Sequence, residues 1–236
     1  GGAGADIITG GDAGDTITGG SGNDNITGGT GADIITGGAG NDIIAGGAGA
    51  DIITIGTAGH GNSDTMDGGA GADVLQLSTG SHTFATDNKL QNVETVATHS
   101  SGSTVDLSGQ SEGLTVTGSA SVDEITGSSG TDIINAGAGA DIITIGTAGH
   151  GNSDTMDGGA GADVLQLSTG SHTFATDNKL QNVETVATHS SGSTVDLSGQ
   201  SEGFTVTGSA SVDEITGSSG ADTINAGAGA DIITIG

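Results

Sequence analysis

The sequence predicts an all-β repeat protein rather than an ordinary globular domain. Six segments of nine residues follow one another without a break over 1–54, and each ends in three residues with strand character. The 236 residues include 49 glycines and no proline, cysteine or tryptophan. Two further blocks, at 57–146 and 147–236, are nearly identical to each other. A short unit repeated in phase dictates the same local structure many times over.

Each nine-residue unit combines a glycine-rich turn, an aspartate and a short strand. In the first unit, GGAGADIIT, the glycines permit the positive-φ backbone of a tight turn, and Asp6 follows that turn. Because side chains alternate along a strand, the middle strand residue faces the core and its neighbours face outward. The predicted core residues of these units are Ile8, Ile17, Ile26, Ile35, Ile44 and Ile53.

The turns are rich in oxygen donors. A tight turn directs its carbonyl oxygens inward, and the aspartate at the sixth position adds a carboxylate. Ca²⁺ takes about six to eight oxygen ligands in a flexible geometry, which such a mixture satisfies. Mg²⁺ prefers a smaller octahedral shell with retained water, and zinc prefers nitrogen and sulfur ligands, which the turns do not contain. The residue types therefore favour calcium.

The pattern GGxGxDxUx resembles the calcium-binding nonapeptide of RTX proteins. The resemblance implies a right-handed parallel β-roll, or β-solenoid, in which two nonapeptides make one coil and turns two units apart share an ion. Asp6 would then work with the turn at 19–24, and Asp15 with the turn at 28–33. The unit at 10–18 lacks glycine at its fourth position and is the least regular.

The predicted calcium ligands are the sixth-position aspartates of the regular and variant units. Pairing turns two units apart gives roughly ten ions. The residues are Asp6, Asp15, Asp24, Asp33, Asp42, Asp51, Asp64, Asp73, Asp123, Asp132, Asp141, Asp154, Asp163, Asp213, Asp222 and Asp231.

The charge balance excludes several classes of partner. The formal net charge is −27, and Lys89 and Lys179 are the only lysine or arginine residues. Nucleic acid is excluded as a partner because phosphate neutralisation needs basic residues, and no apolar run approaches membrane-spanning length. A chain so acidic and so rich in glycine stays unfolded unless something supplies the missing free energy, and divalent cations do so by neutralising the carboxylates.

Three regions are predicted: a regular β-roll at 1–56 and two 90-residue repeats at 57–146 and 147–236. The repeats differ only at positions 114/204, 131/221 and 133/223, and we expect the parent protein to be a longer array. Within the first repeat, 77–117 has few turn glycines, but apolar residues spaced nine apart indicate that the solenoid continues, with a looser excursion around 78–98. A separate small domain is the disfavoured alternative, because about forty polar residues could hardly bury a core alone.

Other motifs carry weaker signals. The GQSEG segments match a nucleophile elbow around Ser111 and Ser201, but no helical pattern follows them, so a catalytic role is disfavoured. The six histidines lack partner histidines at ligand spacing and are interpreted as surface or turn residues; they are His60, His82, His99, His150, His172 and His189.

Three acidic or amide positions of the first repeat remain open, as do their copies at 157, 182 and 184. Asp67 either adds a carboxylate to a neighbouring ion or is solvated. Asn92 and Glu94 either make ladder hydrogen bonds or hold an auxiliary ion. The outward strand positions combine Ile and Thr, as in Ile7 and Thr9, which indicates either simple β-propensity or faces that pack against other molecules.

Together these features predict an extracellular structural protein, not an enzyme: a calcium-dependent surface layer, filament or adhesin stalk on the bacterial cell surface, because tandem duplication of a rod elongates it. The alternatives are the calcium-folding tail of a secreted enzyme or toxin and, on the threonine columns, an ice-binding solenoid. The expected partners are calcium ions, further copies of the chain and cell-surface polysaccharide. The resemblance implies type I secretion in an unfolded state, with folding on meeting external calcium.

Overall fold

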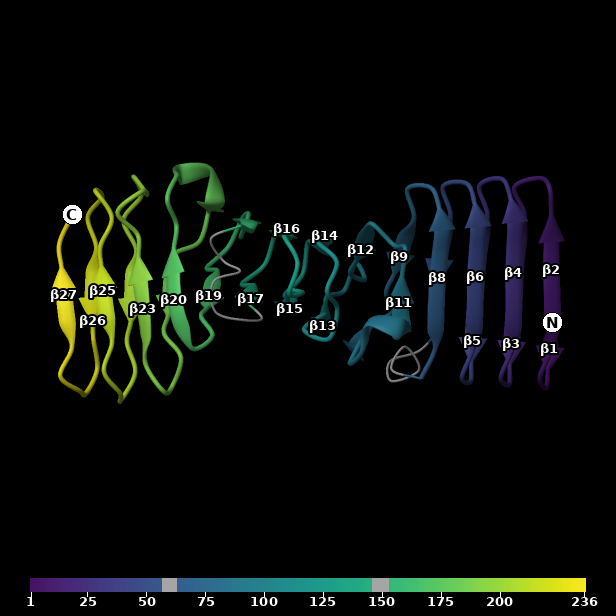
Figure 1. Cartoon of the computed structure of the whole chain (residues 1–236), viewed down its shortest axis with the longest axis horizontal. Coiled ribbons are helices and arrows are strands. Elements are labelled where there is room, and N and C mark those ends of the chain that lie inside the picture. The colour runs from purple at the N-terminus through teal and green to yellow at the C-terminus, as the bar shows by residue number, and fades with distance from the viewer. Residues whose placement is uncertain (57–62, 146–152) are drawn as a thin grey trace.

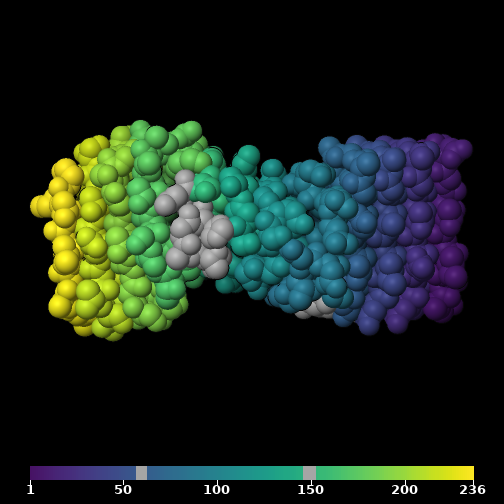
Figure 2. Space-filling view, in the orientation of Figure 1, coloured from purple at the N-terminus to yellow at the C-terminus, as the bar shows by residue number. Residues whose placement is uncertain are grey.

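The computed structural model describes residues 1–56, 63–145 and 153–236. The chain winds as a parallel β-solenoid, with its two termini at opposite ends of an elongated body (Figures 1 and 2). Every strand pairing is parallel, and no α-helix lies within the described residues. The predicted all-β solenoid is confirmed.

The first run of strands covers the regular nonapeptides and the start of the first repeat. These strands are β1 (Gly2–Ala3), β2 (Ile7–Gly11), β3 (Thr16–Ser21), β4 (Asn25–Thr30), β5 (Ile34–Ala39), β6 (Ile43–Ala48), β7 (Ile52–Thr54), β8 (Thr65–Ala70) and β9 (Val74–Gln76).

The rest of the first repeat holds one short 3-10 helix and a further set of strands. These elements are β10 (Gly80–Thr83), η1 (Asp87–Lys89), β11 (Leu90–Gln91), β12 (Thr95–Ala97), β13 (Ser103–Asp106), β14 (Thr115–Ser119), β15 (Glu124–Thr126), β16 (Ile133–Gly137) and β17 (Ile142–Thr144).

The second repeat follows the same order. Its elements are β18 (Thr155–Asp157), β19 (Val164–Gln166), β20 (Gly170–Thr173), η3 (Asp177–Lys179), β21 (Leu180–Gln181), β22 (Thr185–Ala187), β23 (Ser193–Asp196), β24 (Thr205–Thr207), β25 (Glu214–Thr216), β26 (Thr223–Asn225) and β27 (Ile232–Thr234).

The register places each nonapeptide on the one 18 residues later. Ile8 pairs with Ile26, and Ile17 pairs with Ile35. Two nine-residue units therefore make one coil, as the resemblance implied. The middle isoleucines pack in a core one aliphatic residue thick, while Ile7 and Ile43 keep 86% and 56% of their surface exposed on the outside of the same strands.

Four sheets form the walls of the solenoid. A 10-stranded sheet runs from β1 to β21, and a 5-stranded sheet, β11-β8-β6-β4-β2, lies opposite it over the regular run. An 8-stranded sheet begins at β10 and replaces the 5-stranded one, and a 4-stranded sheet begins at β20. The two repeats therefore place equivalent strands in different sheets: β12 belongs to the 10-stranded sheet, whereas β22 belongs to the 8-stranded sheet.

The segment 77–117 continues the solenoid. β12 pairs with β9 before it and β14 after it, and Phe84 is fully buried in the same core cluster as the isoleucines. The predicted looser excursion contains η1, which lies between β10 and β11. One core cluster includes residues from the regular run and from both repeats, which disfavours an independent domain in this segment.

Candidate metal-binding turns

The sixth-position aspartates form a ladder along the turns of the solenoid. The amide of Asp33 donates to Oδ1 of Asp51 at 2.8 Å, and the amide of Asp15 donates to Oδ1 of Asp33 at 2.7 Å. Each carboxylate is therefore oriented by the coil before it. The same bond joins Asp6 to Asp24, Asp24 to Asp42, Asp42 to Asp64, Asp51 to Asp73, Asp123 to Asp141, Asp132 to Asp154, Asp141 to Asp163 and Asp213 to Asp231.

In many of these turns the second carboxylate oxygen lacks a protein partner. Oδ2 is buried and accepts no hydrogen bond in Asp6, Asp24, Asp33, Asp51, Asp73, Asp141 and Asp163. A buried, unpaired charged oxygen costs several kcal/mol unless a cation or donor compensates it. The two lysines do not compensate them: Lys89 Nζ donates to the carbonyl of Ser63, and Lys179 Nζ to that of Ser153.

Backbone carbonyls converge on the same oxygens. A Cβ added to Gly28 would collide with Oδ2 of Asp33 and with the carbonyl oxygen of Gly46, one coil on. Gly29, the next residue, has φ +126°, which a side chain would oppose. Within the described residues no three His, Cys, Asp or Glu side chains gather around one point, so these turns offer carboxylate and carbonyl oxygens in place of a side-chain cage. Such a donor set fits Ca²⁺.

A second kind of turn carries serine where the second glycine stands. Asp132 Oδ2 accepts the amide of Ser128 at 2.7 Å, and Asp132 Oδ1 accepts the Ser128 hydroxyl at 2.7 Å and the amide of Leu114 at 2.9 Å. Asp123 is held in the same manner, because its Oδ2 accepts the amide and the hydroxyl of Ser119 at 2.8 Å each. Equivalent bonds join Ser209 to Asp213 and Ser218 to Asp222.

A comparison with known protein families identifies the repeat that carries the aspartate ladder. The model of the RTX calcium-binding nonapeptide repeat (4 copies) matches residues 1–26, 18–53, 58–81, 115–144, 148–171 and 205–235, which is more than half of the chain. The chain belongs to the RTX calcium-binding nonapeptide repeat family. It is thus a calcium-binding repeat protein. A search of curated proteins gave no match.

The direction of the aspartate pKa shift differs between the turns with glycine at the second position, the glycine turns, and those with serine there, the serine turns. Burial raises the pKa of Asp141 above its usual value, and the neighbouring carboxylates of Asp163 and Asp123 raise it further. Burial likewise raises the pKa of Asp73 and of Asp163. Burial also acts on Asp213, but the hydrogen bonds from Ser209 and Ser193 outweigh it and lower the pKa of that carboxyl. In these glycine turns the charged carboxylate has too few hydrogen-bond donors to offset its burial. In the serine turn of Asp213 the hydrogen bonds stabilise the charged form.

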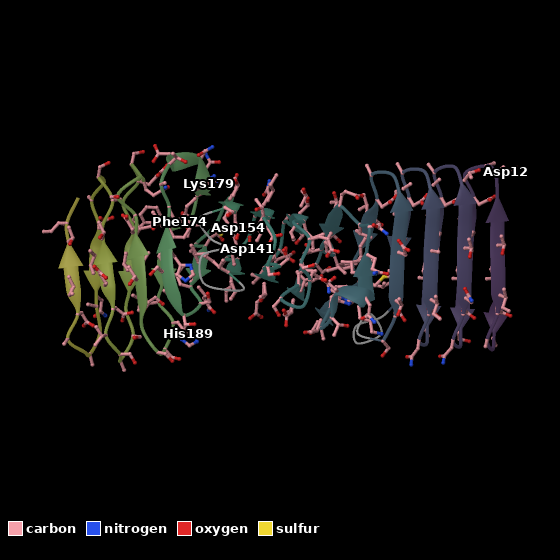
Figure 3. The ribbon with its side chains drawn as sticks, viewed as in Figure 1. Asp12, Asp141, Asp154, Phe174, Lys179 and His189 are labelled. Atoms are coloured by element: carbon pink, nitrogen blue, oxygen red, sulfur yellow. The ribbon has the colours of Figure 1, made fainter. Side chains whose placement is uncertain are left out.

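The irregular unit at 10–18 keeps its place in the ladder. Asp15 is half-buried, and its amide reaches Asp33 as in the regular units. The extra Asp12 lies on an exposed turn at the edge of the molecule (Figure 3), where its carbonyl accepts the Thr30 hydroxyl at 3.0 Å. Asp12 is therefore a suitable surface control for the buried aspartates.

The positions left open by the sequence make ladder contacts. Glu94 Oε2 accepts the amide of Asp73 at 2.7 Å, as Glu184 Oε2 does for Asp163. Asn92 Nδ2 donates to Asp67 Oδ1 at 2.7 Å. Sequence periodicity did not place Glu94 among the predicted ligands, because the longer coil at 73–94 breaks the nine-residue phase.

The remaining motifs do not form a catalytic arrangement among the described residues. Ser111 Oγ donates to Asp87 Oδ2 at 2.6 Å, and strand β14 follows it where an elbow would require a helix. The interpretation of His82 as a surface or turn residue is wrong, because its side chain is fully buried on β10. Its Nε2 lies 3.0 Å from the carbonyl oxygen of Ser78. His172 repeats that contact with Ser168.

The other predicted residues are placed as follows. His99 is half-buried in a turn, where its Nδ1 accepts the Ser101 amide at 3.1 Å, and His189 repeats this contact with Ser191. His60 and His150 lie outside the described residues. Within the residues described, no helix has the length and apolar character that crossing a membrane requires.

Proposed function

We propose that calcium ions bind between stacked glycine turns and that the folded chain is a section of an extracellular structural rod, such as a surface layer, filament or adhesin stalk. The observation that carries the proposal is the continuous core shared by the regular run and both repeats. A solenoid whose repeats add to one another without a break grows in length with each duplication.

Calcium is proposed to act at the glycine turns and not at the serine turns. Asp33 and Asp51 present a buried Oδ2 without a partner, whereas the oxygens of Asp132 accept three hydrogen bonds. A cation compensates the former and has little to add to the latter. When bound, calcium would supply positive charge and oxygen coordination between successive coils. Of the aspartates predicted from the sequence as calcium ligands, four are therefore proposed not to bind the ion: Asp123, Asp132, Asp213 and Asp222.

The rod is proposed to assemble with other copies once calcium has neutralised its carboxylates. At −27 the bare chains repel one another. Exposed isoleucines such as Ile34, Ile43 and Ile133 lie on the outer faces of the sheets and offer apolar contact area. Export in an unfolded state and folding in external calcium agree with this charge balance. Cell-surface polysaccharide remains a proposed anchor.

Electron microscopy and sedimentation test the structural role. The chain should form filaments or sheets in millimolar calcium and disperse in excess chelator. As a matched control, sodium chloride at the same ionic strength should not replace calcium, because screening alone does not fill the turns. A calcium-folded particle that stays monomeric at high concentration would contradict the structural role and favour the tail of a secreted enzyme or toxin.

The ice-binding alternative has weaker support. Thr18, Thr36 and Thr54 stack in register on one face, but Gln76 and Ala97 continue that column. A flat threonine array three residues long gives a small regular surface. Thermal hysteresis of the calcium-loaded chain would revive this alternative.

A further inference from the structure

The glutamate that ends the aspartate ladder marks a site of its own. The residues at 15, 33, 51 and 73 stack one coil apart, since each donates its amide to the carboxylate of the next. Glu94 continues that stack, because its Oε2 accepts the Asp73 amide at 2.7 Å. The strands that follow keep the register: the amide of Thr95 donates to the carbonyl of Asp73 at 3.1 Å. Glu94 therefore occupies the sixth position of the next coil although no nonapeptide precedes it.

Asn92 supplies the carbonyl that a nonapeptide glycine supplies elsewhere. A Cβ on Gly68 would collide with the carbonyl oxygen of Asn92 and lie 2.7 Å from Oδ2 of Asp73. In the regular coils the same point on Gly28 meets the carbonyl of Gly46. Asn92 has φ 49°, a left-handed conformation that asparagine tolerates better than most residues. Its side chain is fixed by the 2.7 Å hydrogen bond to Asp67.

The oxygen that this arrangement surrounds needs a cation. Asp73 is fully buried, and its Oδ2 accepts no hydrogen bond. The Glu94 carboxylate adds a second negative charge to the same turn, and no lysine lies there, since Lys89 contacts Ser63. Glu94 itself is exposed, beside a hollow lined by Asn92, Gln110 and Glu112, so a hydrated ion has access.

We infer that Asp73, Glu94 and the carbonyl of Asn92 form a calcium site at the end of the ladder that begins at Asp15. Asp163, Glu184 and Asn182 form its copy at the end of the ladder that begins at Asp123. Leu114 occupies the next position of the column, so the run of carboxylates ends at Glu94. The inference rests on the proposed calcium binding between turns and adds a glutamate-terminated site to it. Solvent exposure of Glu94 leaves coordination positions for water, which Ca²⁺ accepts.

The second copy repeats the geometry in full. Glu184 Oε2 accepts the Asp163 amide at 2.7 Å, and Asn182 has φ 50°. A Cβ on Gly158 would collide with the Asn182 carbonyl oxygen, and Asp163 Oδ2 is buried without a hydrogen-bond partner. The two copies give one experiment two independent sites.

Calcium counting with E94Q/E184Q tests the site. Glutamine keeps an oxygen that can accept the Asp73 and Asp163 amides but removes both charges, so the fold is retained while the cation is lost. After equilibration at limiting free calcium, elemental analysis should find one ion fewer per substituted turn than in the wild type. The control E124Q/E214Q changes exposed glutamates whose Oε2 approaches only threonine hydroxyls, at 3.4 and 3.5 Å, and should keep the full count.

The outcomes distinguish this site from the proposed function. A wild type that binds no calcium would overturn both. A wild type that binds calcium and an E94Q/E184Q variant with an unchanged count would overturn the glutamate site alone. If E94Q/E184Q loses its β-structure in calcium, the variant E94D/E184D, which restores both negative charges, is measured in its place. It should recover both the bound ions and the β-structure. Recovery of the β-structure without the ions would overturn the glutamate site.

Discussion

The amide of Asp33 donates to Oδ1 of Asp51 at 2.8 Å, while Oδ2 of Asp51 is buried and accepts no hydrogen bond. One oxygen thus fixes the carboxylate to the preceding coil, and the other is left for a ligand that the protein does not supply. Repeated along the turns, this relationship couples the register of the solenoid to the capture of cations. The same hydrogen bonds that stack the coils also bring like charges together.

Asp33→Asn should remove cation binding locally without breaking the ladder. Asparagine can still accept the Asp15 amide, but the charge next to Gly28 is lost. We expect the loss of about one ion and faster hydrogen exchange around residues 15–51, because each coil contacts only its neighbours. Coils beyond 118 should keep their protection.

The surface variant Asp12→Asn is the matched control for this experiment, since it removes an exposed charge from the same run. It should leave both ion count and exchange unchanged. Uniform loss of protection along the whole chain in Asp33→Asn would contradict a quasi-one-dimensional solenoid.

Ser128→Ala should destabilise its coil in saturating calcium without changing the number of bound ions. The Ser128 hydroxyl donates to Asp132 Oδ1 at 2.7 Å in a buried turn, so its removal leaves a carboxylate oxygen with one donor fewer. The expected loss in local opening free energy is about 1–3 kcal/mol, measured by hydrogen exchange over residues 114–133. Ser108→Ala, at an exposed position, serves as the control. A lower calcium count in Ser128→Ala than in the wild type, measured by elemental analysis, would place an ion at this turn.

Acid should destabilise the buried-histidine coils. Burial lowers the pKa of His82 and of His172 below the usual 6.5, because the charged imidazolium loses its hydration in the core. The unfolded chain therefore binds more protons below about pH 6.5, so the stabilising contribution is complete above that pH and is lost as the pH falls toward the lowered pKa.

Thermal unfolding in saturating calcium at pH 7.5 and pH 5.5 measures this effect. The drop in melting temperature of the wild type should shrink in His82→Gln/His172→Gln. The variant His99→Gln/His189→Gln, altered at half-buried turn positions of the same repeats, should follow the wild type. Equal drops in all three proteins would show that the buried histidines do not govern the acid response.

Local periodicity was sufficient to predict the regular run. The burial of Ile17 and Ile35 follows from a nine-residue unit with one apolar strand centre, whereas their pairing 18 residues apart was implied by the resemblance to the RTX nonapeptide. Periodicity could not separate the serine turns, because Ser128 and Gly29 occupy the same position and differ only in what they donate to the aspartate. Hydrogen bonding, not spacing, distinguishes them.

The glutamate at the end of the ladder was also beyond the sequence pattern. The coil from Asp73 to Glu94 includes β10 and η1, so 21 residues separate ladder partners that are 18 apart in regular coils. Likewise, His82 became a core residue because β10 pairs it with Val105, a contact between coils of unequal length. Such long-range register depends on how the excursion folds.

Circular dichroism of the chain titrated with calcium tests the central claim most directly. The buried, unpaired Oδ2 atoms of Asp24, Asp33 and Asp51 and the net charge of −27 oppose folding of the metal-free chain. We predict a coil spectrum in excess chelator and a cooperative change to β-structure at roughly 0.1–1 mM calcium, the range of extracellular calcium modules, while Mg²⁺ at the same concentration has little effect. Full β-structure in chelator would contradict the account.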